Sequence, residues 1–276
     1  MGHLHFIRLT LSAAIVLLIS SCATLSGNGV GRVKHYSVVS DRLPVSFDGV
    51  RVAFLSDLHF PSKFTPKRLQ KLVACLHKEA PDVLLLGGDY VPSGSYAQQL
   101  FSSFSSLNTP YGKYAVPGNH DYRLLDTLSV AMKGAGVRLL ADDVAFLSNA
   151  ADTIAVVGIN NPFKPSLLAR ELAGNVCDDF FTILLAHTPD FAQDVGACCD
   201  VALSGHTHGG QVSLFGLYTP VKNTKYGTRF LRGRNHTVNG VPVITTNGVG
   251  TSRRKVRFWV PSELVIVTLR AERSVK

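Results

Sequence analysis

Apolar runs that stop abruptly at polar residues recur along the chain and predict buried β-strands. The first clear run covers 50–55, and a second covers 82–86, where the sequence Gly-Gly-Asp follows. Between them, apolar residues recur at helical spacing behind Thr65 and Pro66, a pair typical of an N-cap and first helical turn. The residues at helical spacing are Leu69, Leu72, Val73 and Leu76.

The same alternation continues towards the C-terminus. Further strands are expected at 113–116, 137–140, 144–147, 154–159, 180–185 and 201–203, and further helices at 95–107, 122–134 and 166–172. The C-terminal part, 240–269, is expected to form strands with a basic loop between them. Because strands alternate with helices early and dominate later, the pattern predicts an α/β sandwich with two packed sheets.

The composition fits one large domain. The chain has 276 residues, 46% of them hydrophobic and 17% charged, which allows a substantial core. Its formal net charge of +9 favours anionic partners such as phosphate esters or an acidic membrane surface. We expect no nucleic-acid partner because no DNA- or RNA-binding motif accompanies the charge. The cysteines show no C-x-x-C spacing, and we expect the adjacent Cys198 and Cys199 to be buried free thiols.

The N-terminus has the features of a targeting segment. A charge-free apolar run at 9–19 follows Arg8; it is too short for a comfortable membrane span of ~20 residues but fits the core of a signal peptide. The sequence from Ile19 to Cys22 resembles a bacterial lipobox, in which the cysteine is lipidated; the alternative is an uncleaved anchor. Either form attaches the protein to a bacterial membrane, at the inner membrane or as a lipoprotein, and leaves the face open. The expected parts are 1–25 (signal peptide or anchor), 26–44 (linker and first strand) and 45–276 (folded domain).

Five predicted strands end in residue types that bind metals or perform acid–base chemistry. A strand-end Asp often caps a turn, and a lone His such as His187 is often an ordinary buried polar residue. Ligands in α/β sheets nevertheless gather outside the carboxyl ends of strands, so one shared site explains all five better than five coincidences. The residues are Asp57 and His59, Asp89, Asn119 and His120, His187, and His206 and His208.

This pattern resembles the calcineurin-like metallophosphoesterase superfamily, whose blocks are D-x-H, G-D, G-N-H-[DE], a single H and G-H-x-H. All the blocks are present in order: Asp57-Leu58-His59, Gly88-Asp89, Gly118-Asn119-His120-Asp121, His187 and Gly205-His206-Thr207-His208. The resemblance implies a four-layer α/β/β/α sandwich of two mixed sheets flanked by helices. It also implies a two-metal centre in the loops at the strand ends.

The resemblance assigns two divalent metal ions to these residues, with Asp89 as the shared ligand. Two dications about 3.5–4 Å apart need an anionic bridge, and they clamp a phosphoryl group and make hydroxide available near neutral pH. Nitrogen and oxygen ligands suit Mn²⁺, our first expectation, and also Fe or Zn²⁺. One ion would be held by Asp57, His59, Asp89 and His208, and the other by Asp89, Asn119, His187 and His206.

Two neighbouring residues are implied to be catalytic rather than metal-binding. His120 would stabilise the phosphoryl oxygens or protonate the leaving oxygen. Asp121 would orient His120 through its carboxylate.

A narrower resemblance suggests the substrate. The blocks at 186–190, 209–211 and 247–252 are similar to a bacterial branch of membrane-associated phosphohydrolases that includes chlamydial-type UDP-2,3-diacylglucosamine pyrophosphatases of lipid A biosynthesis. Hydrolysis of the UDP-2,3-diacylglucosamine pyrophosphate is therefore the leading expectation. The alternatives are an extracytoplasmic nucleotide or phospholipid phosphodiesterase and a non-catalytic membrane lipoprotein. The intact ligand blocks argue against the last, because a scaffold has no physical need for them.

A basic run near the C-terminus is interleaved with apolar residues. Arg253, Arg254 and Lys255 are candidates for binding the substrate pyrophosphate or an acidic headgroup, and Arg257 belongs to the same run. A solvated loop is the alternative. The oligomeric state is left open.

Overall fold

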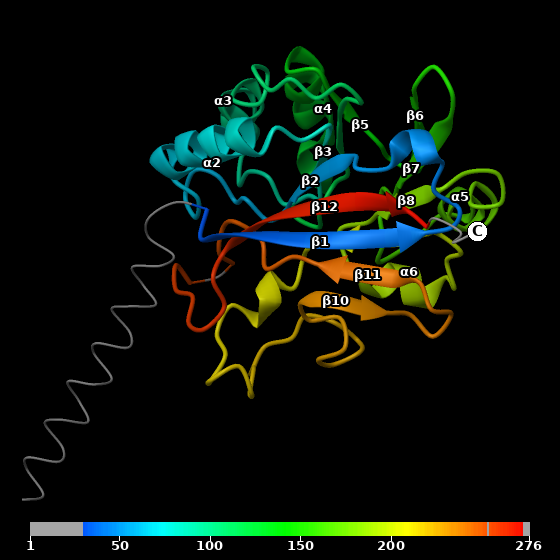
Figure 1. Cartoon of the computed structure of the whole chain (residues 1–276). Helices are drawn as coiled ribbons and strands as arrows, with labels where there is room; N and C mark the ends of the chain where they lie inside the picture. The colour runs from blue at the N-terminus through cyan, green and yellow to red at the C-terminus, as the bar shows by residue number, and fades with distance from the viewer. Residues whose placement is uncertain (1–29, 253, 273–276) are drawn as a thin grey trace, which may run out of the picture.

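The fold was analysed in a computed structural model that describes residues 30–252 and 254–272 (Figure 1). The predicted targeting segment, the first part of the linker and Arg253 lie outside the described residues. No helix within the described ranges is both long and apolar enough to cross a membrane.

The first sheet contains the first and last strands of the described chain, together with four strands from its first half. Strand β12 runs antiparallel to β2, and the other neighbouring strands pair in parallel. The strand order is β1 (Arg32–Ser40), β12 (Glu263–Ala271), β2 (Arg51–Leu55), β3 (Val83–Leu86), β4 (Lys113–Ala115) and β5 (Val137–Leu139).

The second sheet is formed by the second half of the chain. Its inner strands are parallel, and its two outer pairs are antiparallel. The strand order is β10 (Gly233–His236), β11 (Pro242–Thr245), β9 (Val201–Ser204), β8 (Thr182–Leu185), β7 (Thr153–Gly158) and β6 (Asp143–Ser148). Both sheets are thus mixed, as the resemblance implied.

Helices cover the outer face of each sheet, so the four-layer prediction is confirmed (Figure 1). The first sheet packs against α2 (Pro66–Glu79), α3 (Ala97–Ser102) and α4 (Leu125–Gly134), and the second against α5 (Leu167–Asn175) and α6 (Asp190–Asp194). Short 3₁₀ turns are η1 (Val45–Phe47), η2 (Gly94–Tyr96), η3 (Tyr122–Leu124) and η4 (His208–Gly210).

The continuous apolar runs in the sequence arise because the central strands are buried on both faces. In β2, Ala53 and Leu55 pack towards the helices, whereas Val52 and Phe54 pack between the two sheets. Strand β3 divides in the same way. Side chains alternate across a strand, so a strand with both faces covered must be apolar at every position.

Helix α2 follows the predicted pattern closely. The Thr65 hydroxyl accepts a hydrogen bond from the Arg68 amide at 3.4 Å, and Pro66 occupies the first turn. The residues Leu69, Leu72 and Leu76 are buried on one face. The helix ends at Glu79, and the residue that caps it, Ala80, has a left-handed backbone.

Two local predictions need correction, and one strand was not predicted. Instead of one helix at 95–107, the structure has the short helix α3 preceded by the η2 turn. The serines after α3 compete for the backbone carbonyls that would continue the helix. Ser103 Oγ donates to the Leu100 carbonyl at 2.5 Å, and Ser105 Oγ donates to the Ser102 carbonyl at 2.7 Å. Strand β10, with its polar sequence, was not predicted. Cys199 is buried, but its neighbour Cys198 is exposed.

Candidate dinuclear metal centre

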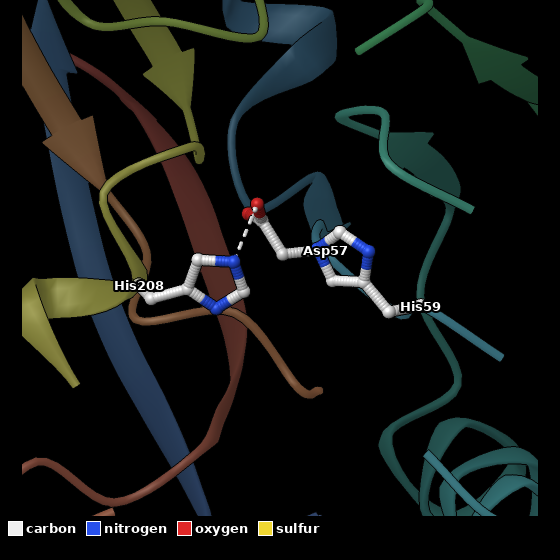
Figure 2. A group of neighbouring side chains, drawn as sticks. All are labelled: Asp57, His59 and His208. Atoms are coloured by element: carbon white, nitrogen blue, oxygen red, sulfur yellow. Dashed lines mark ion pairs between the residues drawn. The ribbon is translucent and has the colours of Figure 1, made fainter. Parts of the chain in front are cut away.

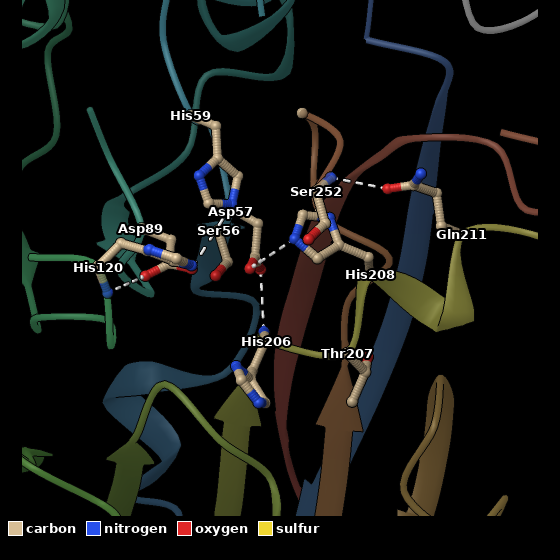
Figure 3. Close-up of polar contacts among 12 residues, drawn as sticks. Ser56, Asp57, His59, Asp89, His120, His206, Thr207, His208, Gln211 and Ser252 are labelled. Atoms are coloured by element: carbon tan, nitrogen blue, oxygen red, sulfur yellow. Dashed lines mark hydrogen bonds and ion pairs between the residues drawn. The ribbon is translucent and has the colours of Figure 1, made fainter. Parts of the chain in front are cut away.

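The predicted ligands converge at one edge of the sandwich, where strands of both sheets end. Figure 3 shows Asp57, His59, Asp89, His206 and His208 at this edge. Asp57 and His59 follow β2, Asp89 follows β3, and Asn119 follows β4, all from the first sheet. His187 follows β8, and the two histidines of the G-H-x-H block follow β9, from the second sheet. The site therefore lies at the junction of the sheets.

The first group consists of Asp57, His59 and His208 (Figure 2). One potential ligand atom from each lies within 4.8 Å of the others. His208 Nε2 is 3.3 Å from Asp57 Oδ1, and His59 Nε2 is 3.5 Å from Asp89 Oδ2. These are the residues predicted to hold one ion.

The second group is centred on His187, which lies within the same 4.8 Å limit of Asp57 and Asp89. Its Nδ1 is 2.7 Å from the Gly87 carbonyl, which can only accept, so Nδ1 carries a proton and Nε2 is the ring nitrogen that faces the ligand cluster. Nε2 is 3.1 Å from Asn119 Oδ1 and 3.2 Å from His206 Nδ1. The remaining predicted ligands thus surround this second position.

Asp89 has the geometry of a bridging carboxylate. Its Oδ2 lies 3.5 Å from His59 Nε2 and 3.6 Å from His187 Nε2, one histidine of each group. Its Oδ1 accepts the His120 backbone amide at 3.0 Å. Asp57 is held similarly, because its Oδ2 accepts the His206 amide at 3.0 Å. In each carboxylate, one oxygen is fixed by a backbone amide and the other faces the ligand cluster.

Several atoms of the cluster fit a bound cation. Asp57 Oδ1 and His59 Nε2 are buried and have no hydrogen-bond partner among the described residues. Buried polar atoms normally have a partner, and leaving such atoms unsatisfied is costly. A dication at the first position would satisfy them. At the second position, the convergence of His187 Nε2, Asn119 Oδ1 and His206 Nδ1 offers donors for another ion.

The electrostatic environment keeps several of the ligands in their metal-binding protonation states. Burial lowers the pKa of His208 to about 3 and that of His206 to about 4, so both imidazoles are neutral at physiological pH. Burial by itself would raise the pKa of Asp57, but the adjacent histidines, His208 foremost, hold it below its usual value. At His187, burial lowers the pKa, but the Asp89 and Asp57 carboxylates raise it above its usual value. Free imidazole lone pairs are therefore offered by His206 and His208.

The backbone of the ligand loops is strained where it presents these side chains. Five predicted ligands have left-handed backbones: Asp57 (φ 58°), His59 (φ 47°), Asp89 (φ 59°), His206 (φ 67°) and His208 (φ 52°). Such values are uncommon outside glycine, and strain of this kind persists where the surrounding structure enforces it, typically at functional sites.

The glycines of the motifs allow the close approach of these loops. A Cβ on Gly205 would lie 2.1 Å from Ser56 Oγ and 2.4 Å from Asp57 Oδ2. A Cβ on Gly118 would lie 2.2 Å from Asp89 Oδ1. Any other residue at these positions would push the two carboxylates out of place.

The two predicted catalytic residues differ in their surroundings. The His120 side chain is 61% exposed, and its Nε2 lies 3.9 Å from Asp89 Oδ2, so it can reach a substrate at the centre. The predicted role of Asp121 needs correction. Its buried carboxylate accepts the backbone amides of Asp89, Tyr90 and Gly118 at 2.7–3.1 Å. Asp121 therefore shapes the loop that carries Asp89 instead of orienting the His120 ring.

The basic run divides into two parts. Arg254 and Lys255 are exposed, whereas Arg257 is buried. Its guanidinium donates to the carbonyls of His208 at 3.1 Å and Asn247 at 2.6 Å, among others. Burial lowers the pKa of Arg257 to about 10, which leaves it charged at neutral pH. Including Arg257 in a surface patch was wrong; it supports the loop behind a predicted ligand.

Sequence reasoning missed two aromatic residues near the centre. Phe163 is 45% exposed, and its ring lies 5.1 Å edge-on from that of His206. Tyr122 has a buried hydroxyl with no hydrogen-bond partner among the described residues. Tyr122 directly follows the G-N-H-D block and so carried a positional signal, but Phe163 lies in a loop with no motif.

The two adjacent ligand groups have Asp57 in common, and Asp89 Oδ2 lies between a histidine of each. This arrangement, at the strand ends of an α/β/β/α sandwich, is typical of the class of dinuclear metallohydrolases. Residues 50–210 match the family described as calcineurin-like phosphoesterase, and the chain belongs to this family. It is a metal-dependent phosphoesterase.

Relatives extend the similarity over most of the chain. The uncharacterized metallophosphoesterase YkuE of Bacillus subtilis is 27% identical over 90% of this chain and 92% of its own length. The phosphodiesterase YaeI of Escherichia coli is 30% identical over 73% of this chain and 75% of its own. A zebrafish (Danio rerio) transmembrane protein with a metallophosphoesterase domain is 26% identical over 87% of this chain and 57% of its own.

The shared position of Asp89 generates a first prediction. Asp89→Ala should lower bound metal and reduce hydrolysis to background, because each ion loses a ligand and the pair loses its bridging anion. Metal content by elemental analysis and turnover of bis-p-nitrophenyl phosphate measure the two effects. Asp126→Ala, at an exposed position on α4, is the control and should match the wild type. Near-normal activity with both metals retained in Asp89→Ala would exclude the bridge.

The exposure of His120 generates a second prediction. His120→Asn should retain both metals but lower turnover by about 10²–10⁴-fold if the imidazole acts as general acid. The loss should shrink for substrates whose leaving groups need no protonation. The exposed His77 of α2 provides the control, His77→Asn. A fall in metal content along with activity would instead make His120 a ligand.

Proposed function

We propose that this protein is a two-metal hydrolase of phosphodiester or pyrophosphate bonds in a membrane-associated substrate, with UDP-2,3-diacylglucosamine as the leading candidate. The observation that carries the chemistry is Asp89 Oδ2, which lies 3.5–3.6 Å from one histidine of each ligand group. When bound there, two dications would clamp a phosphoryl group and supply the nucleophile.

The chain's own residues would complete the reaction. Asp57, His59, Asp89 and His208 would hold one ion, and Asp89, Asn119, His187 and His206 the other. His120 is held over the centre because its backbone amide donates to Asp89 Oδ1. Its exposed ring would donate a proton to the leaving oxygen, or a hydrogen bond to a phosphoryl oxygen. Manganese is the first candidate metal, followed by iron and zinc.

Charge and apolar side chains around the centre support an anionic amphiphile as substrate. Arg254 and Lys255 are exposed on a loop tied to Gln211, which lies three residues beyond His208. Figure 3 shows the Gln211 side chain accepting the Ser252 amide of the same segment. They would bind a phosphate of the substrate. Phe163 offers an apolar surface beside His206. A diacylated sugar nucleotide combines these requirements, with a pyrophosphate between a base and two acyl chains.

The second candidate is an extracytoplasmic phosphodiesterase that acts on nucleotides or phospholipids. It is favoured by the lipobox-like sequence at 19–22, which directs export, and by the similarity to a protein named as a phosphodiesterase. Export would separate the domain from a nucleotide-sugar lipid made at the cytoplasmic face. The membrane side of the domain therefore distinguishes the two candidates.

A substrate panel generates the third prediction. With Mn²⁺, the full chain should convert purified UDP-2,3-diacylglucosamine to UMP and the lipid monophosphate, with a higher kcat/KM than for UDP-glucose, which lacks acyl chains. A bis-p-nitrophenyl phosphate assay reports on catalytic competence independently. Turnover of that synthetic diester without any turnover of the lipid would favour the second candidate, and turnover of neither would count against both candidates.

The N-terminal sequence generates the fourth prediction. Cys22→Ala should block processing and leave a longer form that is still membrane-associated, because lipidation of Cys22 would precede cleavage before it. Mass spectrometry of the mature N-terminus measures this directly, and Ser21→Ala is a neighbouring control. An intact Met1 on the wild-type protein would exclude lipidation and leave the uncleaved anchor.

A further inference from the structure

Two loops beside the metal centre form one continuous surface. The loop at 211–221 starts three residues after His208, and the loop at 254–260 lies against it. The Ser213 amide donates to the Phe258 carbonyl at 2.9 Å, and the Phe258 amide to the Gln211 carbonyl at 3.0 Å. The rings of Phe215 and Trp259 are 5.7 Å apart. Movement of this surface is therefore tied to the loop that carries His208.

This surface is unusually apolar for one exposed to water. Seven of the sixteen exposed large hydrophobic residues in the described part of the chain fall within these two loops. Single exposed apolar side chains need no explanation, but a contiguous patch indicates an interaction. The main contributors are Leu214, Phe215, Leu217 (91% exposed), Tyr218, Val256 and Trp259.

Basic residues border the apolar ones. Lys222, Arg254 and Lys255 are all exposed on the same two loops or directly beside them, and neither loop contains an Asp or Glu. An apolar patch on loops that carry basic but no acidic side chains complements the boundary between the headgroups and acyl chains of an anionic bilayer. Tryptophan and tyrosine are enriched at that depth because their rings combine an apolar body with a polar edge.

The N-terminal part of the chain joins the domain at this same surface. The Arg32 amide donates to the Ser262 carbonyl at 3.0 Å, and Ser262 lies three residues beyond Trp259. Figure 1 shows the yellow and red-orange loops on the side of the molecule where β1 begins. The apolar run at 9–19 precedes this point by about a dozen residues of sequence. A membrane segment there would hold the two loops towards the bilayer.

We propose that the loops at 211–221 and 254–260 form a docking face for an anionic membrane surface, with Phe215, Leu217 and Trp259 inserted at the headgroup–acyl boundary. Interfacial elements of this kind bury about 5–10 Å into the bilayer. The docking face is the second attachment, in addition to the N-terminal segment. The docking face would present the metal centre to phosphates at headgroup depth. The proposal rests on the proposed function only because it takes the substrate to be a membrane amphiphile.

Trp259 makes the docking face directly observable, because it is the only tryptophan in the chain. The full-length protein is reconstituted into phosphatidylglycerol–phosphatidylcholine vesicles whose acyl chains carry bromine near the headgroup. We expect the Trp259 emission to shift to the blue in unlabelled vesicles and to be quenched in brominated ones. Vesicles of phosphatidylcholine alone should quench less, because the basic residues lose their anionic partner.

Matched variants separate docking from attachment by the N-terminal segment. Leu217→Glu should reduce the quenching although the protein still floats with the vesicles, whereas Leu167→Glu, at a 79% exposed position on α5, should leave it unchanged. Both variants should hydrolyse bis-p-nitrophenyl phosphate like the wild type, so a failure of docking is distinguishable from a failure of the proposed chemistry.

Two results would overturn the docking face. One is unquenched Trp259 emission in wild-type protein that floats with brominated vesicles, since the loops would then face water. The other is a blue shift that appears without lipid and rises with protein concentration, in parallel with dimerisation measured by sedimentation. The patch would then be an interface between copies of this chain.

Discussion

The structure depends on two carboxylates, Asp57 and Asp89, that are buried side by side where the two sheets meet. Burying an anion is costly unless it is paired and hydrogen-bonded. Each carboxylate meets this need in the same way: one oxygen accepts a backbone amide from a ligand loop, and the other faces the imidazoles. Two cations at that point would complete the compensation. The left-handed backbones of the ligands and the glycines of the motifs allow this many polar groups to lie so close together.

The centre also links the two halves of the sandwich. The His206 amide, from the second sheet, bonds to Asp57 of the first, and His187 Nδ1 bonds to the Gly87 carbonyl across the same junction. Arg257 then ties the His208 loop to the loop at 247–250. The ligand geometry therefore requires both sheets to be packed, and metal that binds only the folded form stabilises the whole domain. The proposed docking face continues from these loops, so docking on a membrane, if it occurs as proposed, would set the position of the centre.

The sequence predicted the layers and the ligand cluster because both follow from short-range patterns. Strands buried on both faces are apolar throughout, and polar residues after them mark the active edge of the sheets. The sequence failed where tertiary contacts override local pattern. From the sequence, Arg257 is indistinguishable from an exposed basic residue of the same run. In the structure its buried guanidinium donates to backbone carbonyls of residues up to 49 positions away. The sequence suggests that Asp121 is a partner of its neighbour His120. In the structure, its carboxylate oxygens instead accept the backbone amides of Asp89 and Tyr90, in the loop after β3, and of Gly118. The apolar periodicity predicted a helix to residue 107, but α3 ends at Ser102, where serine hydroxyls bond to the backbone carbonyls.

The central claim is that Asp89 joins two metal ions in one site. Anomalous diffraction from crystals grown with Mn²⁺, recorded at the manganese edge, tests it most directly. We expect two anomalous peaks about 3.5–4 Å apart with the Asp89 carboxylate between them, one peak beside His59 and His208 and the other beside His187 and His206. A single peak, or two peaks that share no ligand, would contradict the assignment.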